Sequence, residues 1–488
     1  WSRPSIEASE PMMRTLPVLL LVANAGFAAA FAPASSILRA PKSLRTQGVN
    51  TVPSRQAPSF LKVRAAASMP MAPALVPEGV PLEKIPEWRK NLDLKAWADE
   101  VRAVEKEFRQ NQGEEDVKHM KKMLTWSYVL YAIGLATAGF AVLPWNPISA
   151  LCLSTAICVR WTMIGHHVCH GGYSAQVGVD SRFHRSKFAR GPIRRFIDWC
   201  DWMLPEAWDV EHNYMHHYEL GEGSDPDLLE RNSHSIRVSN QPKFLKYFQM
   251  FALMVMWKWF YYAPNTLKEM FARQKLLASN RGDNSVVQPF ELSRAPGDFG
   301  DVSKAATIKY VFTEMFKLNF LPAKVVFSCL APYFTAHFVI TPLIFYALFG
   351  HAVAMTAFAN LLLAEVLTNI HSFIIVVPNH AGEDVYRFKT PVKVKSDEFY
   401  LRAVIGSVNF RTGGNVNDFM HGWLNYQIEH HMFADMSMLS YQRMAPKIKE
   451  ICDRHGVPYV QENVFTRLRR TLQIGVGSRS MKVWERGD

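Results

Sequence analysis

Four apolar runs, each long enough to cross a lipid bilayer, set the strongest limit on how this chain can fold. They cover Leu124–Trp145, Pro147–Gly165, Val326–Phe349 and Ala352–Val377. A bilayer core of about 30 Å needs roughly 20 helical residues. Short turns around Pro144-Trp-Asn-Pro147 and at Gly350-His351 join the runs in pairs. The sequence therefore predicts an all-α integral membrane fold with four transmembrane helices in two hairpins.

Two long polar segments, 166–325 and 378–488, follow the hairpins. Four spans place both segments and both termini on one side of the membrane, where we expect a helical cap. Lysines and arginines cluster at 182–195, and positive charge favours the cytoplasmic face, or the stromal face of a plastid. Glu365 lies inside the last apolar run, so its face of that helix is expected to look inward.

Residues 1–77 are typical of upstream residues followed by a targeting presequence. The basic Arg14 precedes the apolar stretch LPVLLLVANAGFAAA, as in a signal peptide. Residues 31–77 then contain no acidic residue and many Ser, Ala and Pro, as in a transit peptide. A signal peptide followed by such a segment resembles the bipartite plastid presequence of algae with red-derived secondary plastids. We therefore expect a plastid membrane protein.

The rest of the chain divides into three parts by composition. Residues 78–120 have the period of an amphipathic helix, 121–465 hold the apolar runs, and 466–488 are interpreted as a basic C-terminal tail. The net charge of +12 includes +6 from residues 1–77, and no basic helix interleaved with aromatics suggests nucleic-acid binding. Six scattered cysteines without a CxxC argue against a thiolate zinc site and for a reducing compartment.

Eight of the 17 histidines fall in three short windows, all on the predicted cap side. The windows read HHVCH at 166–170, HNYMHH at 212–217 and QIEHH at 427–431. Residues i and i+4 share a face of a helix, so His166 converges with His170 and His212 with His216. Imidazole suits iron, copper, nickel and zinc. Eight imidazoles are too many for one ion, so two ions are the natural reading.

Several residues next to the three windows have other candidate roles. His167 points about 100° away from the face of His166 and His170, and is either in the outer shell or only a neighbour. Gln427 repeats the ligand spacing ahead of His430 and His431. Carboxylates near the windows could orient the imidazole rings or belong to ordinary solvated surface. They are Asp209, Glu211, Asp225, Asp227 and Glu429.

These three windows and the two-plus-two layout of apolar runs resemble the integral-membrane fatty acid desaturases over about residues 120–460. That family carries three histidine boxes of the forms HxxxH, HxxHH or HxxxHH, and H/QxxHH. The third box here, QIEHH, resembles that of front-end acyl desaturases. The stretch Asn379-His380-Ala-Gly382 resembles the position of a further family ligand, which assigns that role to His380. Two positions depart from the family pattern. Position 167 is His where Asp is frequent, and position 434 is Ala where a proline often follows the third box. These departures leave the substrate subtype open.

The resemblance implies the chemistry and the partners. It implies a di-iron centre that binds O2 and removes hydrogen from two adjacent methylenes of a membrane lipid acyl chain. No HPGG haem motif of a fused cytochrome b5 occurs in the chain. With a plastid address the expected electron donor is ferredoxin, with free cytochrome b5 as the alternative. The basic residues of 182–195 either dock an acidic ferredoxin or are membrane-side positive charge. The active site would face the stroma.

Two other readings remain open at this point. A related histidine-box hydroxylase or ketolase acting on lipids or carotenoids would use the same iron chemistry to insert oxygen. A zinc-binding membrane carrier would need polar ligands inside its spans, where Glu365 is nearly alone. The sequence does not reveal the double-bond position, the acyl length, the head group, the residues of the acyl tunnel or the oligomeric state.

Overall fold

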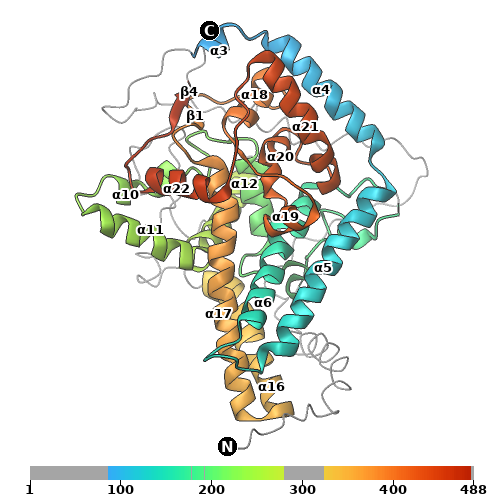
Figure 1. Ribbon diagram of the computed structural model, residues 1–488, viewed down its shortest axis with the longest axis vertical. Helices are drawn as coiled ribbons and strands as arrows, with labels where there is room; N and C mark the ends of the chain where they lie inside the picture. The colour runs from blue at the N-terminus through green and yellow to red at the C-terminus, as the bar shows by residue number, and fades with distance from the viewer. Residues whose placement is uncertain (1–85, 177, 192, 280–323, 485–488) are drawn as a thin grey trace, which may run out of the picture.

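The part of the chain that the structure describes is predominantly helical, and its helices form a narrow bundle below a wider cap (Figure 1). The computed structural model describes residues 86–176, 178–191, 193–279 and 324–484. The predicted presequence, 1–77, lies outside the described residues. Within them the only strands form two pairs of parallel strands, β1 with β4 and β2 with β3.

The bundle consists of long apolar helices that pack side by side. α5 packs on α6, α6 on α17, and α16 on α17. Three helical stretches are long and apolar enough to cross a membrane among the residues that the structure describes: Pro147–His170, Val326–Phe349 and His351–His380. The elements of the bundle are α5 Glu114–Ala138, α6 Pro147–Val159, η6 Val326–Leu330, α15 Ala331–Phe334, η7 Thr335–Ile340, α16 Thr341–Phe349 and α17 His351–Val376.

The first predicted span differs from the helix that forms. We expected Leu124–Trp145, but α5 begins at Glu114 and ends at Ala138, and residues 139–145 make the turn into α6. The acidic residues Glu114, Glu115 and Asp116 stabilise its amino-terminal end because they complement the helix dipole. Only about 15 residues of α5 are apolar, so this helix is not among the three membrane-length stretches. The count of four spans is therefore not confirmed.

One continuous helix carries the chain from the bundle into the cap. α6 runs through the π-helical turn η1 (Arg160–Gly165) into α7 (His166–His170). Arg160 is buried in this helix, where its Nε donates to Ser127 Oγ at 2.6 Å and its guanidinium lies over the Tyr128 ring. Gly165 sits against Trp199, and a Cβ there would come within 2.7 Å of the indole. The close approach of these two residues sets the position of α7.

The cap is assembled from the two polar segments and the N-terminal helices. Its first half contains η2 Ser181–Phe183, η3 Arg195–Trp199, α8 Pro205–Trp208, η4 Asp209–His216, α9 Leu229–Asn232, α10 His234–Arg237, α11 Lys243–Trp257, η5 Lys258–Tyr262 and α12 Ala263–Ser279. Its second half contains η8 Val377–His380, β1 Tyr386–Phe388, α18 Asp397–Ile405, β2 Asn409–Phe410, α19 Asn415–Met420, η9 Leu424–Tyr426, α20 Gln427–Met432, α21 Met438–His455, β3 Gln461–Glu462, α22 Val464–Gly475 and β4 Lys482–Trp484.

The predicted amphipathic segment 78–120 is not one helix. Within the described residues it forms α3 (Glu87–Lys90), α4 (Leu94–Asn111) and the first turns of α5. Asp93 caps α4 by accepting a hydrogen bond from the Ala96 amide at 3.0 Å, and Gly113 separates α4 from α5. The buried face of α4 packs on α21 across the outside of the cap (Figure 1).

The segment interpreted as a basic tail, 466–488, is structured as far as Trp484. α22 begins at Val464, before the predicted boundary, and β4 pairs in parallel with β1. Arg467 explains the difference, because its fully buried guanidinium donates to both oxygens of Asp384 at 2.8 and 2.6 Å. A basic residue that pairs inside the protein is indistinguishable in sequence from one in a solvated tail.

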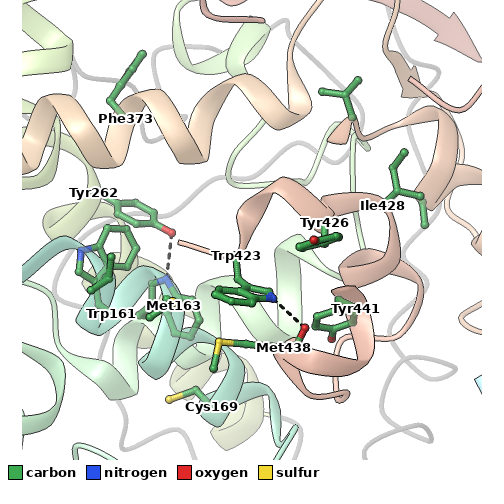
Figure 2. Packing of buried hydrophobic residues seen from close by; sticks show 14 of the residues in the cluster. Trp161, Met163, Cys169, Tyr262, Phe373, Trp423, Tyr426, Ile428, Met438 and Tyr441 are labelled. Atoms are coloured by element: carbon green, nitrogen blue, oxygen red, sulfur yellow. Dashed lines mark hydrogen bonds between the residues drawn. The ribbon is translucent and has the colours of Figure 1, made fainter. Parts of the chain in front are cut away.

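A core of large side chains supports the third histidine window from below. Trp423 is fully buried and donates from its indole nitrogen to the Met438 carbonyl at 2.8 Å (Figure 2). Its φ of 58° is in the left-handed region, as is that of Gly422 at 61°. A bulky residue rarely adopts this conformation, and the cost of order 1–3 kcal/mol must be offset by its surroundings. The two residues redirect the chain from α19 into η9 and α20.

Asn360 of α17 holds the α5–α6 turn, and its loss should destabilise the bundle. Its amide nitrogen donates to the Ala138 carbonyl at 2.8 Å, and its Oδ1 accepts from the Asn146 amide at 2.7 Å. Asn360→Leu leaves both backbone groups buried without partners, so we expect a loss of about 2 kcal/mol and a lower thermal midpoint. Thr356→Ala, which removes a hydroxyl bonded within its own helix, is the control. Equal midpoints for the two variants would contradict this role.

Candidate metal centre

The three histidine windows lie on three separate elements that meet inside the cap. His166 and His170 lie on α7, His212 and His216 on η4 with His217 just after it, and His430 and His431 on α20. His380, predicted from the resemblance, ends η8 directly above α17. The structure brings all eight of these side chains together, although His166 and His431 are 265 residues apart in the sequence.

Five of the imidazoles form one cluster, which we call group one. Their ligand nitrogens all lie within 4.8 Å of one another, and the members are His166, His170, His212, His217 and His430. His212 Nε2 is 2.9 Å from His166 Nε2 and 3.2 Å from His217 Nε2. Nitrogens bound about 2.1 Å from a shared metal ion would lie roughly 3.0–3.4 Å apart in octahedral or tetrahedral geometry. These spacings fit a metal ion.

The other three imidazoles, His216, His380 and His431, form group two. His431 Nε2 is 3.3 Å from His380 Nε2. Gln427 borders this group, with its Nε2 at 3.0 Å from His380 Nε2 and 3.1 Å from His431 Nε2. Its Oε1 instead accepts from Asn379 Nδ2 at 3.3 Å. An amide nitrogen donates and does not bind a metal ion, so in this orientation Gln427 holds the two imidazoles rather than acting as a ligand.

The burial of these rings tests whether a metal ion fits. His170 Nε2 and both nitrogens of His430 are buried and have no hydrogen-bond partner among the described residues. A buried polar atom without a partner costs about 1–3 kcal/mol. A cation between the rings would occupy the unshared lone pairs of several imidazoles at once. The donor set, which is all nitrogen in group one, suits a late first-row transition metal.

The protonation state of the rings in the cap also suits metal binding. Burial lowers the pKa of His212, His217, His430 and His431 well below the ordinary value, and the neighbouring imidazoles lower it further. These four side chains are therefore neutral at physiological pH. A neutral imidazole has a lone pair free for a metal ion, whereas an imidazolium has none.

Asp225 fixes the orientation of His216. Its Oδ1 accepts from His216 Nδ1 at 2.9 Å, and its Oδ2 accepts from the Gly221 amide at 2.8 Å. Burial would lower the pKa of His216, but Asp225 and Asp227 together outweigh it and raise that pKa. In the neutral ring the proton stays on Nδ1, which donates to Asp225, and the lone pair on Nε2 is left for group two. A carboxylate behind a metal-binding histidine acts in this way in many proteins.

The other predicted carboxylates lie in different surroundings. Asp227 Oδ2 is 3.8 Å from His216 Nδ1, and Asp227 also forms a cluster of possible ligands with His212 and His216. Glu211 is fully buried, and its pKa is raised well above the ordinary value by burial and by nearby carboxylates, Asp227 first among them. Glu429 accepts from Tyr459 Oη and Asn409 Nδ2, at 2.7 and 2.8 Å, and no hydrogen bond joins it to the histidines.

Two candidate residues from the sequence analysis, His167 and Asp209, lie outside both groups of imidazoles. His167 donates from Nδ1 to the Met163 carbonyl at 2.6 Å, and its ring centroid is 5.5 Å from that of His430. Asp209 pairs with Arg190 at 3.0 Å and accepts from Asn213. His167 thus packs beside group one, and Asp209 anchors the basic segment to η4.

An apolar cavity opens onto both groups. Its wall includes His166 and His212 from group one and His216 and His380 from group two. The rest of the wall is mostly aromatic or aliphatic, contributed by Trp161, Trp208, Leu229, Leu253, Trp257, Tyr261, Tyr262, Phe373, Val376, Val377 and Leu424. The sequence did not assign these residues, because aromatic side chains near a membrane usually serve as interfacial anchors. An apolar space beside a metal site can hold a hydrocarbon chain.

Comparison with known proteins agrees with this geometry. A sequence profile of the fatty acid desaturase family matches residues 142–463, which contain all three histidine windows. The chain belongs to the fatty acid desaturase family. It is therefore an oxidoreductase of lipid metabolism, and with its membrane-length helices a multi-pass membrane protein.

Individual members of the desaturase family resemble this chain over most of its length. A protein from Mycobacterium tuberculosis called NADPH-dependent stearoyl-CoA 9-desaturase is 24% identical over 385 residues, 78% of each chain. A Synechocystis protein called sn-1 linoleoyl-lipid 6-desaturase is 21% identical over 340 residues, 68% of this chain and 78% of its own. No solved structure matches the chain.

Removing one histidine ligand from either group should release the metal ion of that group and leave the other ion bound. We expect the purified chain, reconstituted with iron, to hold two ions, and His430→Ala or His431→Ala to retain about one, because each removes a ligand from a different group. His421→Ala, whose ring donates to the Asn417 carbonyl, is the control and should keep both. Metal content per chain by mass spectrometry measures this. Two ions in both His430→Ala and His431→Ala would contradict the grouping.

Removing the charge behind His216 should weaken metal binding in group two. Asp225→Asn keeps an acceptor for His216 but loses the carboxylate and leaves the Gly221 amide with a poorer partner. We expect about 10- to 100-fold weaker retention of one of the two ions in competition with a chelator. The control is Asp209→Asn, because the native Asp209 pairs with Arg190 and belongs to neither group. This variant should retain both ions. Identical chelation curves for the two variants would exclude a positioning role for Asp225.

Proposed function

We propose that the protein is an acyl-lipid desaturase that introduces a double bond into a fatty acyl chain with O2 at a histidine-bound di-iron centre. The observation that carries the proposal is the apolar cavity, whose wall includes imidazoles of both metal-binding groups. A hydrocarbon chain in this cavity would lie directly beside both ions. Group one and His216, His380 and His431 are the ligands that we propose, with Asp225 as the residue that orients His216.

Bound iron would supply the oxidising power that breaks unactivated C–H bonds, which side-chain acids and bases cannot do. In the balanced reaction two C–H bonds break, one C=C bond forms, and O2 is reduced to two waters. Two electrons come from the substrate, and two electrons and two protons come from outside. The reaction therefore requires an electron donor and an acyl chain held away from water.

The protein's own residues prepare the site for this reaction. The imidazoles of His212, His217 and His430 in group one are neutral, so each has a lone pair available to bind a metal ion. Trp208 and Tyr262 are buried in the cavity wall and are joined by a 3.1 Å hydrogen bond from Trp208 Nε1 to Tyr262 Oη. This bond gives the indole N–H of Trp208 an acceptor, so the two rings present apolar surface to the acyl chain on their side of the wall.

We propose a one-electron protein as the donor, with reduced ferredoxin preferred and cytochrome b5 as the alternative. A small surface opening lined by Tyr218, Phe399 and Arg402 reaches His217 and His431, so one ligand of each group lies close to the cap surface there. The basic segment 182–195 supports docking less well than its sequence suggested. Arg195 is buried and donates to backbone carbonyls, and Arg190 is paired with Asp209.

The location follows from the same proposal. The presequence in residues 1–77 favours a plastid membrane, with the metal centre on the stromal side. The pairing of α5 with α6 and of α16 with α17 supports two membrane hairpins. The QIEHH window favours the front-end type of desaturase. These finer assignments rest on the sequence and on the resemblance.

Expression in a host with its own ferredoxin tests the proposal. A cyanobacterium that makes residues 78–488 should accumulate a new unsaturated acyl lipid, and gas chromatography with mass spectrometry would locate its double bond. The double variant His430→Ala and His431→Ala should abolish the product, because both groups lose a ligand. His421→Ala should retain it. A hydroxylated lipid in place of the alkene would instead establish the hydroxylase reading.

A further inference from the structure

The packing of α11 against α17 places one wall of the cavity. This helix extends away from the side of α17 (Figure 1). At their contact Trp257 donates from Nε1 to the Asn369 carbonyl at 3.0 Å, and its ring lies 5.9 Å from that of Phe373. The C-terminal end of α11 is thus fixed to one level of α17.

The length of α17 relates that level to the thickness of a lipid bilayer. α17 begins at His351, and Asn369 lies 18 residues further along. At 1.5 Å per residue this is about 27 Å, close to the roughly 30 Å thickness of a hydrocarbon core. If the turn at Gly350 lies at the far edge, α11 lies in the interface on the cap side.

The exposed surface of α11 is apolar, as an interfacial helix requires. Phe244, Tyr247, Phe248 and Phe251 repeat at the spacing of one helix face, and we call them the aromatic stripe. Phe244 is 74% exposed and Phe248 63%. Met250, on a different face, is buried, and it packs against Gly475 of α22 in the cap. Among the described residues the stripe is left uncovered, and a bilayer at this level would cover it.

The mouth of the cavity opens beside the same helix. Most of the residues that line the cavity are buried, but Leu253 of α11 is half-buried, and so are Val376 and Val377 at the end of α17. Leu253 lies one turn before Trp257, and Val376 lies about one turn after Phe373. Leu253 and Val376–Val377 therefore line the same cavity, near the contact between Trp257 and Phe373 that joins α11 to α17.

We propose that an acyl chain of a membrane glycerolipid enters the cavity sideways from the bilayer, between Leu253 and Val376–Val377. The aromatic stripe keeps α11 in the lipid interface so that the mouth opens into the leaflet. The glycerol and head group remain in the interface while one chain reaches the metal-binding groups. This inference rests on the proposed function, and it selects a bilayer lipid over a thioester that arrives from water.

Photo-crosslinking tests the entry route without any need for catalysis. The full chain would be placed in phosphatidylcholine vesicles that contain phosphatidylcholine with a diazirine in one acyl chain, and adducts would be mapped by peptide mass spectrometry. We expect adducts on residues of the cavity wall such as Phe373 and Leu424. Leu253→Trp, which fills the mouth, should reduce these adducts by about tenfold. Val255→Trp adds the same indole to the same helix off the cavity and should not change them.

Two results would overturn the proposal. One is an equal yield of cavity adducts in Leu253→Trp, Val255→Trp and the unaltered chain. The other is labelling of the cavity by an acyl-CoA that carries the same diazirine, but not by the phosphatidylcholine probe. Iron content measured on the same samples shows that each variant is folded. Desaturation measured on the same vesicles reports on the proposed function alone, so failure of the route and failure of the activity are distinguishable.

Discussion

The structure depends on the convergence of eight imidazoles, seven of them buried, in one place without enough protein partners for their nitrogens. Group one and group two lie inside the cap, and the nitrogens of His430 have no hydrogen-bond partner among the described residues. Such a core is costly for an apo chain and becomes favourable when metal ions occupy the lone pairs. The same burial keeps the rings of His212, His217, His430 and His431 neutral, and thus ready to bind metal.

The rest of the fold brings these rings together and leaves a path to them. The continuous helix from α6 into α7 carries the first window out of the bundle, and η8 continues α17 to His380. Gly422 and Trp423 both have φ angles in the left-handed region, and they set the direction of the chain into α20. The cavity lies where these helix ends meet η4 and α11, so its wall includes imidazoles of both groups together with the half-buried Leu253 and Val376. Site and substrate path are thus consequences of one arrangement.

The sequence predicted the parts of this arrangement that are local. Helical spacing placed His166 beside His170, and three of the four apolar runs correspond to membrane-length helices. His212 and His216 lie on the π-helix η4 and fall into different groups. Asp225 was among the candidate carboxylates, and its contact with His216 required the turn at Gly221. Long-range packing was not readable. Contacts between distant segments decide three features that the sequence did not predict. They are the end of α5 at Ala138, the burial of Arg467 in a supposed tail, and the cavity wall at Trp257 and Tyr262. The assignment of rings to two groups depends on such contacts as well.

An anomalous difference map, recorded at the iron absorption edge from crystals of the iron-loaded chain, tests the central claim most directly. We expect two peaks in the cap. One should lie about 2.1 Å from nitrogens of group one, and the other at the same distance from His216, His380 and His431. A single peak, or iron bound at residues outside these groups, would contradict the account of two histidine-bound ions beside an apolar cavity.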